Sequence, residues 1–186
     1  MDIDAATCVV LCGGTSRRFG GGDKTAAAFR GATVLDHLLS ELPAELPVVC
    51  VGEQRPTARP VSWTREDPPL SGPVAGIAAA LDLVDSPLVA VVAGDMPYAA
   101  RALPDLLAAL RGSPASSSAV AVASDGRLQP LLAVHRAADL RAALPATTDG
   151  VPVRRVLEPL VVIPVTVDDR VADDIDTRDD LERLDE

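Results

Sequence analysis

The sequence predicts an α/β fold built on a mainly parallel central sheet with helices on both faces. Short apolar runs alternate along the chain with segments of helical period, which is the order that a parallel sheet requires. The run at 88–93, LVAVVA, is apolar throughout, as expected for a strand buried on both faces. The first apolar run, at 7–12, passes directly into a glycine-rich stretch, an arrangement that presents backbone N–H groups to a ligand.

Local patterns support each predicted element. The helix at 33–42 has leucines at helical spacing and Thr33 as a candidate cap. The helix at 72–84 has Pro73 in its first turn, and the helix at 103–112 stops at a glycine. Further helices are predicted at 136–144, 151–157 and 177–184. Strands are predicted at 7–12, 48–52, 61–64, 87–97 and 160–167, with a hairpin at 119–135 around Asp125–Gly126.

Composition limits the class of protein. With 186 residues and 48% hydrophobic content, the chain can bury one sizeable core. No apolar run reaches the roughly 18 residues that span a bilayer, and the acidic N-terminus lacks the basic region of a secretory signal. The net charge of −10 argues against nucleic acid or an anionic membrane as a partner. We therefore expect small-molecule substrates.

The cysteines predict no metal centre. Cys8, Cys12 and Cys50 form no CxxC pair and lie far in sequence from His37 and His135. They are interpreted as small buried apolar residues of a protein in the reducing cytoplasm.

The glycine-rich stretch combines backbone freedom with positive charge on an otherwise acidic chain. Arg17, Arg18 and Lys24 lie within eight positions, and Lys24 is the only lysine. Glycines let a backbone approach phosphate closely, and the cations lie beside them. This combination indicates a small anionic ligand. Asp23 stands where a Walker A loop needs glycine, and GxGxxG cannot be aligned. A flexible turn with solvated arginines is the alternative.

Two aspartates are candidate metal ligands. Asp95 directly follows the strand at 88–93, at the sheet edge where ligands bind in open α/β folds, and a carboxylate there suits Mg²⁺. The alternative is a helix cap near Tyr98. Asp176 lies beside the apolar Ile175 in an otherwise acidic tail, and it can face the same edge and complete the site.

Asp67 precedes the helix at 72–84 and is either a turn residue or a ligand contact.

The sequence does not contain the motifs of other common catalytic sites. Neither GxSxG nor HExxH occurs, and the two histidines are isolated from each other in sequence.

Five segments together resemble one family, the molybdenum cofactor guanylyltransferases of the MobA-like nucleotidyltransferases. They are LCGGTSRRFGGGDK, DPPLSGPVAGIAAAL, AGDMP, GRLQPLLAVHR and DIDTRDDL, in the family's order and over nearly the whole chain. The resemblance implies a three-layer α/β/α Rossmann-like nucleotidyltransferase fold as a single domain over 1–186. Residues 1–112 would bind the nucleotide and 113–186 the acceptor.

The resemblance also implies Mg²⁺-dependent transfer of GMP from GTP to molybdopterin, with release of pyrophosphate. Backbone contacts to guanine and ribose would come from Leu11, Gly13 and Gly14. Arg18 and Lys24 would neutralise the triphosphate, and Asp67 would lie near the base or ribose. Asp95 would hold Mg²⁺ with Asp176. A transient protein partner in cofactor synthesis is implied, and we expect a monomer or weak self-association.

The chain departs from the family pattern at Cys12, Phe19 and Arg178, which replace Ala, Met and Pro. Asp176 stands where these guanylyltransferases often carry Asn. Two alternatives therefore stay open. One is a sibling transferase that uses CTP or another phosphorylated acceptor such as phospholactate, and the other is a non-catalytic nucleotide-binding protein.

Overall fold

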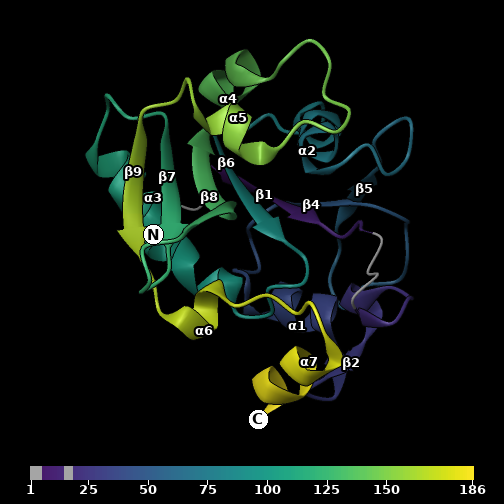
Figure 1. Cartoon of the computed structure of the whole chain (residues 1–186). Coiled ribbons are helices and arrows are strands. Elements are labelled where there is room, and N and C mark those ends of the chain that lie inside the picture. Colours follow the sequence, from purple (N-terminus) through teal and green to yellow (C-terminus); the bar gives the residue numbers. More distant parts are fainter. Residues whose placement is uncertain (1–5, 15–18) are drawn as a thin grey trace.

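The computed structural model describes residues 6–14 and 19–186. Within these residues, seven strands form one sheet in the order β5-β4-β1-β6-β8-β7-β9, which runs from right to left in Figure 1. Neighbouring strands are parallel except where β8 pairs antiparallel with β6 and β7. The predicted mainly parallel sheet is confirmed. The strands are β1 (Ala6–Leu11), β4 (Val48–Val51), β5 (Ser62–Thr64), β6 (Leu88–Ala93), β7 (Ser118–Val122), β8 (Leu128–Arg136) and β9 (Val162–Thr166).

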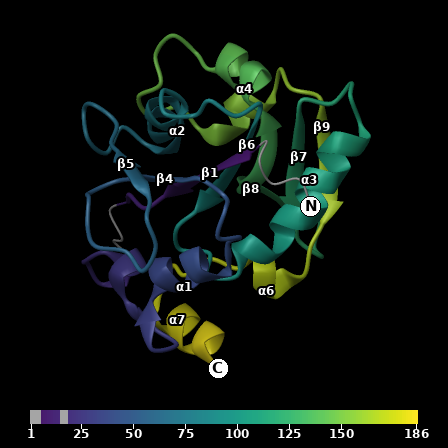
Figure 2. The same ribbon diagram turned by 180° about the vertical axis from the view of Figure 1, so that it is seen from behind.

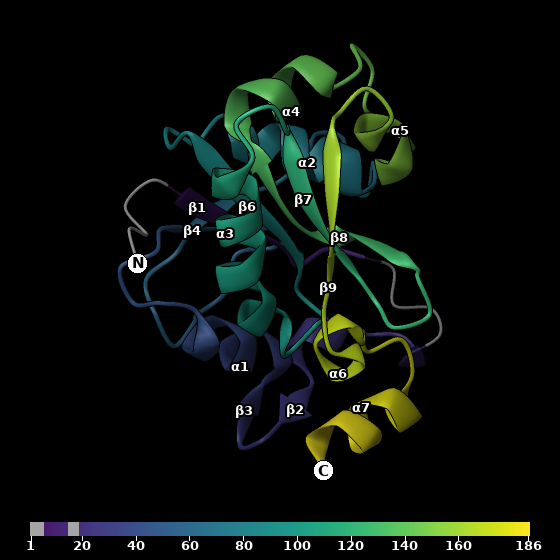
Figure 3. The ribbon, with the colours of Figure 1, turned by 90° about the vertical axis from the view of Figure 1, so that its left-hand side faces the viewer.

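Helices cover both faces of the sheet. Val10 of β1 packs in one apolar cluster with leucines of α1 and α3. Val9, whose side chain points the opposite way, packs in another with Ile77 of α2 and Leu140 of α4. Figure 2 shows α3 in front of β7 and β8, and Figure 3 shows α3 and α5 on opposite sides of β9. The three-layer α/β/α prediction is confirmed. The helices are α1 (Val34–Glu41), α2 (Pro73–Leu81), α3 (Leu103–Gly112), α4 (Ala137–Ala143), α5 (Val153–Leu157), α6 (Asp169–Ala172) and α7 (Arg178–Asp185).

The sequence signals for helix ends mostly hold. Thr33 caps α1 by accepting a hydrogen bond from the Asp36 N–H at 3.0 Å. Helix α2 ends earlier than predicted, because Leu83 and Val84 bond to carbonyls three residues back, which tightens the last turn. Strand β6 likewise ends at Ala93 rather than continuing to residue 97.

Within residues 6–14 and 19–186, the elements that the sequence pattern missed are short. They are the hairpin of β2 (Ala28–Phe29) and β3 (Ala32–Thr33), the 3-10 turns Lys24–Ala26 and Ala99–Ala102, and α6. Two to four residues are too few to establish a period. The predicted hairpin around Asp125–Gly126 is present as β7 and β8, with Gly126 at φ +81° in its turn.

The C-terminal segment returns to the start of the chain. After β9 it passes through α6 to α7, which lies beside α1 and β2 (Figure 1). Ile175 is fully buried, and its N–H donates to the Asp95 carbonyl at 3.0 Å. The Tyr98 hydroxyl donates to the Leu184 carbonyl at 2.8 Å. These contacts attach residues 173–186 to the end of β6.

The predicted burial of the cysteines is confirmed. Cys8, Cys12 and Cys50 are free and buried, and burial raises the pKa of Cys8 to about 12. Among the described residues, no helix has both the length and the apolar character needed for a membrane span.

One buried histidine joins the two strands of the hairpin. His135 of β8 lies opposite Ser118 of β7, with 2.6 Å between its Nδ1 and the Ser118 Oγ. The His135 side chain is 3% exposed, and burial lowers its pKa from 6.5 to about 4. The folded protein therefore favours the neutral imidazole.

We expect this histidine to destabilise the fold in mild acid. Below pH 6.5 the unfolded chain binds a proton that the folded chain takes up only near pH 4, so stability is complete above 6.5 and falls toward 4. The loss is at most about 3 to 4 kcal/mol. Urea unfolding of wild type and His135→Gln from pH 7.5 to 4 measures it, since the variant lacks this titration while the carboxylates titrate in both. A constant difference in unfolding free energy between the two proteins would contradict the assignment.

Candidate functional site

The site begins where the carboxyl ends of β1 and β6 meet. The Gly94 N–H donates to the Leu11 carbonyl at 2.9 Å. A Cβ at Gly94 would stand 3.0 Å from that carbonyl oxygen and 3.4 Å from the Cys12 Cα, so a side chain there would push the strands apart. The missing side chain lets Asp95 lie directly beside the glycine-rich loop.

Lys24 is placed by a small capped turn. Asp23 caps the 3-10 turn Lys24–Ala26, accepting from the Thr25 N–H at 2.9 Å and from the Thr25 hydroxyl at 2.6 Å. Arg55, which follows β4, bonds to both Asp23 and the Thr25 hydroxyl. In the sequence, Asp23 stood out only as a mismatch to the Walker pattern. In the fold it orders the turn that carries the lysine.

The predicted cation and the predicted carboxylates come together. The Lys24 Nζ forms an ion pair with Asp95 and lies 3.1 Å from the Asp176 Oδ1. The side chains of Lys24 and Asp95 are 16% and 15% exposed, so solvent screens their attraction only partly. Burial alone lowers the pKa of Lys24, but the two carboxylates outweigh it and raise that pKa above its usual value.

A third carboxylate, Asp174, joins this cluster and was not predicted. One oxygen each of Asp95, Asp174 and Asp176 lies within 4.8 Å of the others. Although Asp174 is exposed as a whole residue, desolvation by the surrounding protein raises the pKa of its carboxyl group, and the charges of Asp95 and Asp176 raise it further. The sequence carried a signal, because residues two apart in an extended segment share a face and Ile175 between them is buried.

The cluster is rich in carboxylates. Within the described part of the chain, three carboxylates and the Lys24 ammonium lie together. Carboxylate oxygen donors suit a hard divalent cation such as Mg²⁺.

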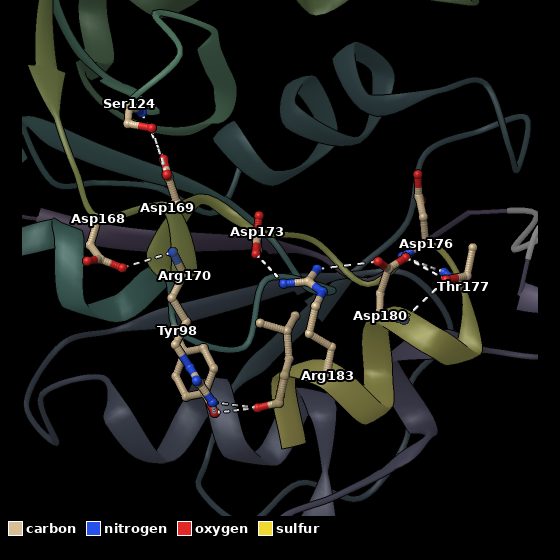
Figure 4. A network of polar contacts seen from close by, with 11 residues as sticks. Tyr98, Ser124, Asp168, Asp169, Arg170, Asp173, Asp176, Thr177, Asp180 and Arg183 are labelled. Atoms are coloured by element: carbon tan, nitrogen blue, oxygen red, sulfur yellow. Dashed lines mark hydrogen bonds and ion pairs between the residues drawn. The ribbon is translucent and has the colours of Figure 1, made fainter. Parts of the chain in front are cut away.

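Hydrogen bonds around the start of α7 fix the position of Asp176. The Thr177 Oγ1 accepts from the Asp180 N–H at 3.1 Å, and the Asp180 carboxylate accepts from the Thr177 N–H at 2.9 Å, which completes a capping box. Arg183 pairs with Asp173 at 2.6 Å and with Asp180 at 3.3 Å. Figure 4 shows this network and the Asp176 side chain pointing away from α7. The segment is thus tied down on both sides of Asp176.

A pocket of about 320 Å³ adjoins the carboxylate cluster. Of the predicted site residues, it contains Leu11, Gly13, Gly14 and Asp95. The other lining residues are Val51, Glu66, Leu70, Gly72, Pro73, Gly76, Ala93 and Leu131. Backbone from the glycine-rich loop, apolar side chains and two carboxylates therefore surround one space.

Among the described residues, the predicted site residues Lys24, Asp67 and Asp176 do not line this pocket. Lys24 and Asp176 belong to the cluster that adjoins it. Asp67 is exposed and lines a second pocket of about 410 Å³ beside α2, with Ala78 and Asp82 among its neighbours. Its neighbour Glu66 borders both pockets. Arg18 lies outside the described residues.

Comparisons with known proteins indicate the family of this chain. Residues 8–164 match the family model described as the MobA-like NTP transferase domain. The chain is 34% identical over 154 residues to the molybdenum cofactor guanylyltransferase of Shewanella frigidimarina, covering 77% of this chain and 76% of that one. It is 30% identical over 196 aligned positions to the probable molybdenum cofactor guanylyltransferase of Natronomonas pharaonis, covering 95% of both.

A solved structure shows the same fold. Molybdopterin-guanine dinucleotide biosynthesis protein A from Archaeoglobus fulgidus superimposes with a TM-score of 0.70 at 22% identity, covering 96% of each chain. The match to the family model covers most of the chain, and this chain belongs to the MobA-like NTP transferase family.

Proposed function

We propose that this protein is a guanylyltransferase that transfers GMP from GTP to the molybdopterin cofactor and releases pyrophosphate. The observation that carries the proposal is the meeting of Lys24 with Asp95 and Asp176 beside the pocket of the glycine-rich loop. The names of the relatives supply the nucleotide and the acceptor. A protein that only bound nucleotide would have no need of the carboxylate cluster.

The two parts of the chain have different roles in this proposal. Residues 1–112 bind the nucleotide, with backbone contacts from Leu11, Gly13 and Gly14, and Asp67 near the base or ribose remains a prediction from the resemblance. Residues 113–186 bind the acceptor and contribute Asp176. A pocket of about 550 Å³ whose lining includes Arg127 and Arg154 together with Glu158 supports this division, since a phosphorylated acceptor needs cationic partners.

The reaction needs no covalent enzyme intermediate. A phosphate oxygen of the acceptor attacks the α-phosphorus of GTP, and the bond to pyrophosphate breaks as the new P–O bond forms. Lys24, with Arg18, neutralises the triphosphate, and the glycine backbone orients it. For Lys24 to do so, its ammonium must leave the carboxylates with which it now pairs.

The carboxylates of Asp95, Asp174 and Asp176 are the residues that would hold Mg²⁺. Their oxygen donors fit that ion. When bound, Mg²⁺ neutralises charge on the triphosphate. The free buried cysteines are consistent with a cytoplasmic reaction, in which the acceptor would arrive through a transient protein partner.

The proposed activity predicts a specific substrate profile. Purified protein with Mg²⁺ and molybdopterin should release pyrophosphate with GTP and much less with CTP. Release with CTP alone would indicate the cytidylyl-transferring sibling. If no nucleotide releases pyrophosphate with any acceptor, the protein is better described as a non-catalytic nucleotide-binding protein.

Lys24→Met and Asp95→Asn should each lower kcat about 10²- to 10³-fold, the usual effect of removing one preorganised charge from a transition state. Steady-state pyrophosphate release measures the change, and thermal unfolding checks that the variants fold. Asp85→Asn is the matched control, because Asp85 is exposed before the amino end of β6. Wild-type kcat in either site variant would refute the assigned role.

Asp174→Asn should raise the Mg²⁺ concentration needed for half-maximal activity by at least about tenfold, because losing even a residue that only supports a metal ligand weakens metal binding by that much. A Mg²⁺ titration after treatment with EDTA measures this shift. Asp179→Asn, a change at an exposed position of α7, should leave the requirement unchanged. If wild type and Asp174→Asn need the same Mg²⁺ concentration for half-maximal activity, Asp174 is not a metal ligand.

A further inference from the structure

Glu66 stands out among the residues that line the 320 Å³ pocket. Among the described lining residues, only Glu66 and Asp95 are acidic, and none is basic. Asp95 is paired with Lys24, so it belongs to the phosphate and metal part of the site. Glu66 has no such partner among the described residues, and its neighbours in the pocket are apolar or glycine.

The local structure holds the Glu66 carboxylate in place. Its Oε1 accepts the Leu70 N–H at 2.9 Å, and Leu70 has a left-handed backbone with φ +67°. This hydrogen bond closes the loop that precedes α2. The second oxygen, Oε2, accepts no hydrogen bond from the described part of the chain and is therefore available to a ligand.

The wall of the pocket around Oε2 is apolar. A Cβ at Gly76 of α2 would stand 3.1 Å from the Val51 Cγ1, 3.4 Å from the Leu11 Cδ2 and 3.9 Å from the Glu66 Oε2. A side chain at Gly76 would therefore crowd Val51 and the Glu66 carboxylate. With glycine at this position, Leu11, Val51 and Glu66 all line the pocket, so a base in it would meet an apolar wall and one carboxylate.

We propose that the Glu66 carboxylate selects guanine by accepting hydrogen bonds from its N1–H and its N2 amino group. Guanine presents these two donors side by side, and an ionised carboxylate only accepts. Cytosine and adenine present a ring nitrogen that is itself an acceptor next to their amino group, so a carboxylate would face a lone pair. This inference rests on the proposed function and adds the residue that determines its base specificity.

The assignment differs from the one drawn from the sequence, which placed Asp67 near the base or ribose. Asp67 lines the other pocket, beside α2. The two assignments, Glu66 or Asp67 as the base contact, therefore predict different effects, and single substitutions distinguish them.

The test compares GTP with ITP, which lacks the N2 amino group, and with XTP, which has a carbonyl there. Binding to the full-length protein with Mg²⁺ is measured by calorimetry, and kcat/KM by pyrophosphate release. Wild type should prefer GTP over ITP by about tenfold to a hundredfold, as for hydrogen bonds to a charged group. Glu66→Gln should reduce that preference to about threefold or less.

Glu66→Gln should also improve the use of XTP about tenfold, because its amide can donate to the new carbonyl. The glutamine oxygen can still accept the Leu70 N–H, so the loop should remain folded. Glu66→Ala, checked by thermal unfolding, should lose the preference for GTP over ITP without gaining XTP. Glu45→Gln, an exposed substitution in the loop before β4, should keep the wild-type ratios.

The outcomes distinguish a failure of the Glu66 assignment from a failure of the proposed guanylyltransferase activity. If wild type uses GTP but Glu66→Gln and Glu66→Ala keep its GTP-to-ITP ratio, the role of Glu66 is wrong and the guanylyltransferase proposal stands. The role of Glu66 is also wrong if Asp67→Asn, rather than Glu66→Gln, abolishes the ratio. If wild type uses no GTP, both proposals fail.

Discussion

The proposed chemistry depends on one electrostatic constraint, the crowding of three carboxylates around a single ammonium group. Asp95, Asp174 and Asp176 repel one another, and Lys24 offsets part of that repulsion by pairing with two of them. Carboxylates this close raise one another's pKa unless a counter-charge offsets the repulsion. In the proposed reaction these carboxylates would hold the divalent cation, and Lys24 would pair with phosphate.

The backbone enforces this crowding. Gly94 lets the ends of β1 and β6 approach closely, which brings Asp95 to the glycine-rich loop. The hydrogen bond from the Ile175 N–H to the Asp95 carbonyl attaches the C-terminal segment at the same point. Burial of Ile175 and the capping box at Thr177 hold that segment in place. Main-chain contacts therefore position groups whose side chains repel.

The pocket separates two tasks that a nucleotide site must perform. In the proposed function, the charged groups around Asp95 contact phosphate, and the part of the pocket lined by Leu11, Val51 and Glu66 holds the base. An apolar wall contacts every base comparably, so discrimination between bases needs a polar group at a defined edge. Among the described residues, Glu66 lines the pocket and has an oxygen, Oε2, that accepts no hydrogen bond from the described part of the chain.

Local sequence patterns were sufficient to predict the fold class, most element positions and the residues Lys24, Asp95 and Asp176, because hydrophobic period, caps and strand ends are local properties. Helix α3 begins and ends where predicted, as its proline and glycine require. The sequence patterns missed three features: Asp23 caps the lysine turn, Asp174 joins the cluster, and Glu66 rather than Asp67 lines the pocket. The Asp23 cap is a local contact. The other two depend on where the fold places these carboxylates relative to distant segments, and no local pattern encodes that distance.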